Sequence, residues 1–205
     1  MIKYSDIDPR KRAFVFELDD VLYPEKDYLY QVYYLFTAFL EYIEFIDAKV
    51  ATSFMIDTYL SEGKQFVFDR LKEKFGLDEK YRFNFEHLSN TAKLPLKLLL
   101  DKEMLTFLQD IVVDRKKIFI VTNGNPGQQL NKIKQTEWQG LEPYLICYFA
   151  DEIAPKPETD SIDLLLKDHN LQRRDVLMIG NSDIDRQCAD ACGIDLIKPI
   201  EFSQV

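Results

Sequence analysis

Residues 13–20 read AFVFELDD, a short apolar run that ends abruptly in acidic residues. Such a run is typical of a strand buried on both faces, with its carboxyl end at the solvent. Stretches with a helical period separate four more runs of this kind: Ile118–Val121, Ile146–Phe149, Val176–Ile179 and Leu196–Ile197. Strands that alternate with helices predict an α/β fold built on a doubly wound, Rossmann-like parallel sheet.

The composition narrows the class of protein. The chain has 205 residues, 46% of them hydrophobic, which fits one globular domain or one domain with an insertion. Its 26 basic and 35 acidic residues give a net charge of −9, which disfavours a nucleic-acid partner. No apolar stretch approaches the length that spans a bilayer, and three cysteines fit a reducing compartment. We therefore expect a cytoplasmic protein without a membrane partner.

Residues 23–94 differ from the rest of the chain in their pattern of apolar residues. Apolar and aromatic residues recur there at steps of three and four, with no convincing strand. The sequence therefore predicts an all-helical insert at 23–94 and an α/β core formed by 1–22 and 95–205. An insert after the first strand can serve as a lid over the strand ends, where ligands of such sheets collect.

Acidic side chains follow the first predicted strand. In an extended strand Glu17 and Asp19 point to the same side, so two carboxylates share one small region. A divalent cation with oxygen ligands, above all Mg²⁺, would relieve their repulsion. An acidic turn that merely ends a strand is the alternative interpretation of this fragment.

Polar residues also follow the later strands. Thr122 and Asn123 come directly after one strand, Lys156 lies between two prolines, and Asn181 and Asp185 follow the strand 176–179. Each has an ordinary structural interpretation, as a turn, a surface lysine or a helix cap. The carboxyl ends of parallel strands meet at one edge of a sheet, so together these residues predict a shared site.

The order of these segments is similar to that of the haloacid dehalogenase-like hydrolase superfamily. Its four motifs resemble FELDDVLYP at 16–24, IVTNGNPGQQLNKI at 120–133, APKPE at 154–158 and VLMIGNSDIDRQCADACG at 176–193. The helical insert resembles the cap of the subgroup that includes many small-metabolite phosphatases. The resemblance covers nearly the whole chain.

The resemblance implies a set of roles. Glu17 would take the position of the nucleophile that attacks phosphorus, and Asp19 that of the acid and base. The phosphate would be held by Thr122, Asn123 and Lys156, and the Mg²⁺ ion by Glu17, Asp19, Asn181 and Asp185. This chemistry combines a covalent intermediate with electrostatic stabilisation of the transferred phosphoryl group.

Two positions depart from the family pattern. Glu17 stands where the family has Asp, and its extra methylene shifts the attacking oxygen by about an ångström, which can cost on the order of 10²-fold in rate. Asn181 stands where the family has Asp, which keeps an oxygen ligand but removes a negative charge beside the metal. Weaker Mg²⁺ binding is the expected result.

Several functions are compatible with this pattern. The first is a Mg²⁺-dependent phosphatase of a small phosphorylated metabolite, acting through an acyl phosphate and impaired by Glu17 and Asn181. The second is a catalytically silent protein that binds a phosphorylated ligand or a partner. Dehalogenation of a haloacid is a further possibility in the same superfamily. A phospho-accepting receiver domain fits poorly, because its lysine should follow the last strand and its sheet carries no such insert.

Overall fold

The computed structural model describes residues 3–199, so the ends of the expected core, 1–2 and 200–205, lie outside the described residues. The chain forms two compact units. The α/β unit comprises the chain up to Pro24, Leu98–Gln129, and the chain from Thr136 onward. The helical unit comprises Glu25–Lys97 and Leu130–Gln135.

The α/β unit is built on a five-stranded sheet in the order β5-β3-β1-β6-β7, and every neighbouring pair is parallel. The strands are β1 (Ala13–Phe16), β3 (Lys117–Thr122), β5 (Leu145–Phe149), β6 (Val176–Ile179) and β7 (Asp195–Ile197). The α/β fold predicted from the five apolar runs is confirmed. In the centre, Phe16 of β1 is paired with Ile120 and Ile179. The segments after these three strands therefore start at the same edge of the sheet.

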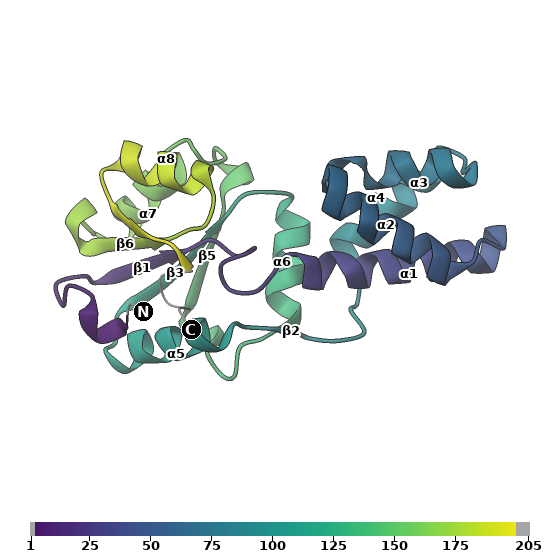
Figure 1. Cartoon of the computed structure of the whole chain (residues 1–205). Helices are drawn as coiled ribbons and strands as arrows, with labels where there is room; N and C mark the ends of the chain where they lie inside the picture. Colours follow the sequence, from purple (N-terminus) through teal and green to yellow (C-terminus); the bar gives the residue numbers. More distant parts are fainter. Residues whose placement is uncertain (1–2, 200–205) are drawn as a thin grey trace. The chain divides into compact units, whose positions relative to one another are not determined.

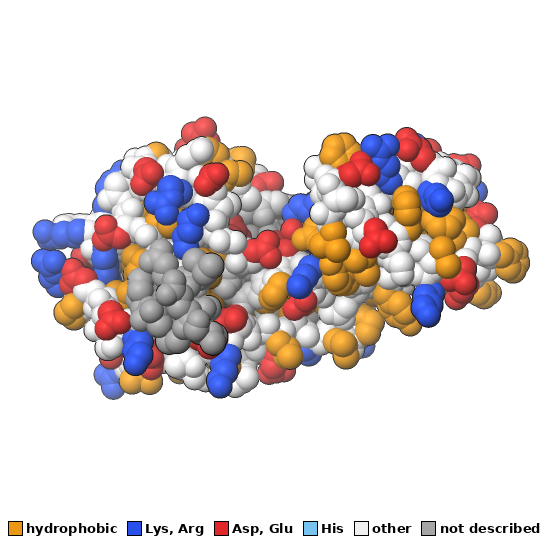
Figure 2. All heavy atoms as spheres, in the orientation of Figure 1, with side chains coloured by type: hydrophobic (Ala, Val, Ile, Leu, Met, Phe, Trp, Pro, Cys, Tyr) orange, Lys and Arg blue, Asp and Glu red, His pale blue; other side chains and the backbone are white. Residues whose placement is uncertain are grey.

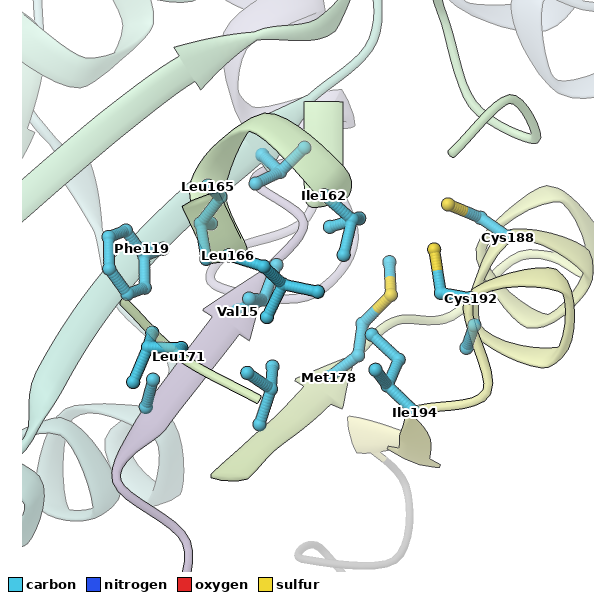
Figure 3. Packing of buried hydrophobic residues seen from close by; sticks show 14 of the residues in the cluster. Val15, Phe119, Ile162, Leu165, Leu166, Leu171, Met178, Cys188, Cys192 and Ile194 are labelled. Carbon is cyan, nitrogen blue, oxygen red and sulfur yellow. The ribbon is translucent and has the colours of Figure 1, made fainter. Parts of the chain in front are cut away.

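Apolar side chains cover both faces of this sheet. On one face Val15, Phe119 and Met178 pack against helices α7 (Asp160–Asp168) and α8 (Asp183–Cys192), as Figure 3 shows. Helix α5 (Lys102–Val113) lies on the other side (Figure 1), where the Phe107 ring is 5.6 Å from that of Phe14. Each fully buried phenylalanine contributes about 1.5–3 kcal/mol.

The helical unit contains α1 (Lys26–Glu44), α2 (Ala48–Glu62), α3 (Val67–Phe75), α4 (Tyr81–Thr91) and the end of α6 (Pro126–Gln135). Phe36 is fully buried, with its ring 5.0 Å from that of Phe85 and 6.2 Å from that of Phe68. Other aromatic side chains of this unit are exposed, among them Tyr42 and Phe45. Figure 2 shows hydrophobic side chains gathered on the visible face of these helices.

Residues 130–135 belong to the helical unit, which the sequence did not predict. Asn131 Nδ2 donates to the Ala92 carbonyl at 2.9 Å and to the Tyr28 hydroxyl at 3.1 Å. Lys132 is fully buried, with its ammonium 3.6 Å from Glu25 Oε1. These polar contacts, rather than an apolar pattern, join the segment to the unit.

The remaining elements are short. Strand β2 (Leu98–Leu99) pairs with β4 (Thr136–Glu137) in a separate parallel ladder. The 3₁₀ helices are Tyr4–Asp6, Lys64–Phe66, Glu142–Tyr144, Ala150–Glu152 and Arg173–Asp175. Within residues 3–199 every helix is too short or too polar to cross a bilayer.

Candidate active site

The first acidic segment lies just beyond the end of β1. The strand ends at Phe16, two residues earlier than the apolar run suggests, so Glu17 and Asp19 both follow it. The Glu17 amide still donates to the Ile179 carbonyl at 3.1 Å, and the Leu18 amide donates to Glu17 Oε1 at 2.6 Å. Asp20 has φ 57°, which turns the chain. A tight turn thus presents both carboxylates at the sheet edge.

The Lys156 ammonium lies between two carboxylates. It is 2.5 Å from Glu17 Oε2 and 2.5 Å from Asp185 Oδ1. The side chains of Lys156 and Asp185 are 1% and 2% exposed, and that of Glu17 is 13% exposed. Removing Lys156 from this buried group would leave two uncompensated carboxylates, and a loss of this kind typically costs about 3–5 kcal/mol.

Burial and pairing move the pKa values of these groups in different directions. Burial raises the pKa of Glu17, and the opposing effects of Lys156, Thr122 and the Leu18 amide are smaller. Burial also raises the pKa of Asp185, but its bonds with Lys156 and Ser182 outweigh this, so that its pKa is lowered. The pKa of Lys156 is raised, because its two carboxylate partners outweigh its desolvation. Of Glu17 and Asp185, Glu17 therefore binds a proton more readily.

The start of α8 holds Asp185 in place. Its Oδ2 atom accepts hydrogen bonds from the Asn181 amide at 3.1 Å, the Ser182 amide at 3.0 Å and the Ser182 hydroxyl at 2.7 Å. Ser182 Oγ in turn accepts from the Asp185 amide, so Ser182 is the N-cap and Asp185 the third residue of a capping box. A Cβ at Gly180 would lie 2.6 Å from that of Asp185, so glycine is required at that position.

Asn123 fixes the loop that carries Lys156. Its Nδ2 atom donates to the Lys156 carbonyl at 2.8 Å, and its Oδ1 atom accepts from the Lys156 amide at 3.0 Å. The resemblance assigned the Asn123 backbone amide to phosphate binding, but gave no role to its side chain. That side chain joins the end of β3 to the lysine loop.

Gln129 is a site residue that the sequence reasoning missed. It is 1% exposed. Its Nε2 atom donates to Asp19 Oδ2 at 3.1 Å, to Thr122 Oγ1 at 2.7 Å and to the Asn123 carbonyl at 2.9 Å. Its position in the sequence could have identified it. Gln129 lies in the first turns of the helix that follows Thr122-Asn123-Gly124, and from there a glutamine side chain is long enough to reach the end of the strand.

The structure brings most of the predicted site residues together. Bonds through Lys156 and Gln129 connect them: Glu17, Asp19, Thr122, Asn123, Lys156 and Asp185. Asn181 is exposed, and its backbone amide contacts Asp185. Asn181 also lines a cavity of about 430 Å³, together with Asp20, Tyr23 and Asp101.

The arrangement does not fit the Mg²⁺ ion that the resemblance implies. The Lys156 ammonium already lies between Glu17 and Asp185, and the second oxygen of Asp185 accepts three hydrogen bonds. Asn181 brings no charge to the position that the resemblance assigns to the metal. Within residues 3–199, no three His, Cys, Asp or Glu residues are grouped so that they could hold a metal ion.

Comparisons with known proteins agree with the fold. A family model described as haloacid dehalogenase-like hydrolase matches residues 14–198. The structure is similar to a hydrolase from Streptococcus pneumoniae TIGR4, with 17% identity, 92% of each chain covered and a TM-score of 0.56. It is also similar to a candidate beta-phosphoglucomutase from Thermotoga maritima, with 16% identity, 93% of this chain and 96% of that chain covered, and a TM-score of 0.66.

A third similar structure is the L-2-haloacid dehalogenase from Xanthobacter autotrophicus, with 16% identity, 91% of this chain and 76% of that chain covered, and a TM-score of 0.56. At these identities the similarity shows the fold alone. The comparison with curated proteins found no match.

Proposed function

Because the chain belongs to the haloacid dehalogenase-like hydrolase family, we propose that it is a slow phosphatase of a small phosphorylated metabolite, with Glu17 as nucleophile. The observation that carries this proposal is the pair of carboxylates beyond β1, each held by its own polar partner. Glu17 is bonded to Lys156 and Asp19 to Gln129. A nucleophile and an acid held independently are what a two-step transfer of a phosphoryl group needs.

The proposed reaction has two steps. In the first, a Glu17 oxygen forms a bond to phosphorus while the bond from phosphorus to the leaving oxygen breaks, and Asp19 gives its proton to that oxygen. In the second, Asp19 takes a proton from water, and the water oxygen displaces Glu17 from phosphorus. The products are an alcohol and inorganic phosphate, and both carboxyl groups return to their starting states.

Two features of the site argue for a low rate. Glu17, Asp19 and Asp185 outnumber the Lys156 ammonium, so an incoming phosphate dianion meets excess negative charge. Glu17 must also break its ion pair with Lys156, and its raised pKa leaves less of it in the reactive ionised form. Turnover should therefore fall as the pH is lowered and Glu17 becomes protonated.

The test is hydrolysis of a generic aryl phosphate and a panel of phosphorylated metabolites. We expect Asp19→Asn to lower kcat/KM for alkyl phosphates on the order of 10²-fold or more. We expect Glu17→Asp to increase turnover on the order of tenfold or more, because the shorter side chain restores the position of the attacking oxygen. Asp20→Asn, the same change as Asp19→Asn at an exposed neighbour, is the matched control. A wild-type enzyme with no turnover, in which Glu17→Asp creates activity, would refute the proposal.

Members of this superfamily generally use Mg²⁺, but the donor set described above leads us to give the metal no step in this reaction. Asn181→Asp restores a carboxylate at the metal position. We expect this variant to bind Mg²⁺ at least about tenfold more tightly than the wild type, since hard cations prefer charged oxygen ligands. Calorimetric titration with Mg²⁺ measures the change, and Asn125→Asp on the same unit is the control. Equal affinities in wild type and Asn181→Asp would contradict it.

A silent, ligand-binding protein is the second candidate function. It is favoured by the Glu17 carboxylate, of which one oxygen bonds to Lys156 and the other to the Leu18 amide. Under this alternative the wild type is inactive, even where Glu17→Asp creates activity, yet inorganic phosphate still binds to the wild type. A chloride-release assay with 2-chloropropionate in the same panel tests dehalogenation.

We also propose a reducing, cytoplasmic location for the protein, which its three free cysteines support.

A further inference from the structure

We infer that Gln129 is a positioning residue for Asp19: its side-chain amide aims the Asp19 carboxyl group at the leaving oxygen of the substrate. The inference rests on the proposed function, in which Asp19 is the general acid. It adds a residue to which neither the motifs nor the family resemblance gave a role.

The hydrogen bonds of Gln129 determine which way its amide points. Nε2 faces three oxygens, those of the Asp19 carboxylate, the Thr122 hydroxyl and the Asn123 carbonyl. The flipped amide would place Oε1 against the Asp19 carboxylate and the Asn123 carbonyl, which can only accept hydrogen bonds. The donor end of Gln129 is thus directed at Asp19.

The oxygen of the same side-chain amide suggests that a contribution to stability alone does not explain why glutamine stands at position 129. Gln129 Oε1 is buried and has no hydrogen-bond partner among the described residues 3–199. A buried acceptor without a partner destabilises the fold, and each such group calls for an explanation. Holding a reactive group in position is such an explanation.

Gln129 also connects Asp19 to the phosphate-binding position. Thr122 Oγ1 accepts from Gln129 at 2.7 Å, and its own hydroxyl is directed at the Asn123 carbonyl at 3.4 Å. One amide therefore orients both the proposed acid and the hydroxyl of the proposed phosphate-binding residue. Both bonds arise because α6 begins directly after β3 and returns Gln129 to the strand end.

The chemistry of the leaving group provides a specific readout. An alkoxide is a poor leaving group and needs the proton from Asp19 as the bond to phosphorus breaks, whereas p-nitrophenolate leaves without it. A residue that positions the acid should matter for alkyl phosphates and much less for p-nitrophenyl phosphate. A residue that only supports the fold should affect both substrates equally.

The experiment compares kcat/KM for glycerol 2-phosphate and p-nitrophenyl phosphate in three variants. Gln129→Met keeps the length of the side chain and removes the donor, and Gln129→Glu keeps its shape and replaces the donor with oxygen. Gln128→Met, the same change one residue earlier on α6, is the matched control. We expect both Gln129 variants to lose about tenfold or more activity on the alkyl substrate beyond their loss on the aryl substrate, mainly in kcat.

A double-mutant cycle separates positioning from other effects. In an Asp19→Asn background the acid is already gone, so Gln129→Met should cause no further difference between the two substrates. Equal losses on both substrates, or an undiminished substrate difference in that background, would overturn the inference. If Gln129→Met does not fold, Gln129→Glu decides by the same ratio. A wild type that hydrolyses neither of these two substrates nor any phosphate of the metabolite panel refutes the proposed function, and this inference with it.

Discussion

The three buried charges at the sheet edge are unequal partners. Lys156 neutralises one carboxylate, and Asp185 is the better supported of the two because three further donors surround it. Glu17 has fewer donors and a raised pKa. Its ionised form is therefore poorly stabilised. This lowers the stability of the protein at neutral pH and reduces the fraction of Glu17 that can attack phosphorus.

Glu17→Gln should stabilise the protein as pH rises. Between the ordinary carboxyl pKa of 4.5 and the higher folded value, the folded wild type binds more protons than the unfolded chain, so its free energy of unfolding falls as pH increases. Each unit of the raised pKa corresponds to about 1.4 kcal/mol. Gln carries no proton, and Asp185 still pairs with Lys156.

Urea unfolding at about pH 4.5 and pH 8 measures this effect through linkage. We expect the variant and the wild type to differ little at the lower pH, and the variant to be the more stable at the higher one. Glu137→Gln makes the same change at an exposed position as a control. A stability difference that stays constant across this range would contradict the raised pKa.

Gly180→Ala should disturb the same site through packing. The new methyl carbon would lie 2.6 Å from the Cβ and 2.9 Å from the Cγ of Asp185, a side chain that cannot move because both its oxygens are bonded. Overpacking of this kind typically costs about 1–3 kcal/mol. Thermal unfolding measures the cost. Gly127→Ala in α6 is the control, and there we expect a smaller cost, because the added Cβ would meet only Asn125 Oδ1, at 3.2 Å.

At the level of residues, the sequence predicted which residues converge at the sheet edge better than it predicted the hydrogen bonds that hold them there. Glu17, Thr122, Lys156 and Asp185 were expected to converge, because strand ends of a parallel sheet share an edge. Gln129 and Ser182 were not expected, because their contacts depend on how the first turn of each helix is rotated after the preceding loop. A pattern of residue types does not specify that rotation.

The N-cap residues of two helices in the α/β unit differ in whether they also bind a site residue. Ser182 caps α8 and also donates to the Asp185 carboxylate, whereas Asp101 Oδ1 caps α5 by accepting from the Glu103 and Met104 amides. Loss of a cap costs about 1 kcal/mol. Loss of a donor to a buried carboxylate adds about 1.5–3 kcal/mol.

Ser182→Ala should therefore destabilise the protein more than Asp101→Ala. Urea unfolding of the two variants measures the difference, which we expect to be at least about 1 kcal/mol. The comparison is matched, since each change removes one N-cap from a helix that packs on the same sheet. Equal costs would show that the Ser182 hydroxyl does little for Asp185.

The strands were predictable because each is a nearly continuous apolar run, which is what burial on both faces requires. All five lie at the expected places, with small differences at their ends such as the early end of β1 at Phe16. The ladder of β2 and β4 was missed. Two residues in each strand are too few to produce a recognisable pattern.

The whole molecule divides into two units, and the sequence predicted only part of that division. The helical insert predicted at 23–94 has bounds close to those of the observed segment 25–97. Residues 130–135 were missed because Asn131, Lys132 and Gln135 join the helical unit through polar bonds to distant residues. Hydrophobic periodicity reports burial and carries no information on such partners.

A fragment of residues 25–97 should consequently be unstable on its own. Without 130–135 the Ala92 carbonyl loses its Asn131 partner, and Glu25 loses the buried Lys132. Circular dichroism during thermal unfolding should show weak cooperativity, as for a bundle with an incomplete core. Joining 130–135 to the fragment through a flexible Gly-Ser linker should restore a cooperative transition. A fragment that unfolds cooperatively without this segment would contradict the division.

The side-chain bonds between Asn123 and the Lys156 peptide have a consequence for chemical ageing. Asn123 precedes Gly124, a pair prone to deamidation because the glycine nitrogen can attack the asparagine amide and expel ammonia. In the folded protein both participants are occupied, the amide by Lys156 and the Gly124 nitrogen by Asp151. Deamidation should therefore proceed mainly in unfolded molecules. The resulting carboxylate lacks the donor that held the Lys156 carbonyl, so long storage in denaturant would leave a fraction of chains that refold with a defective lysine loop.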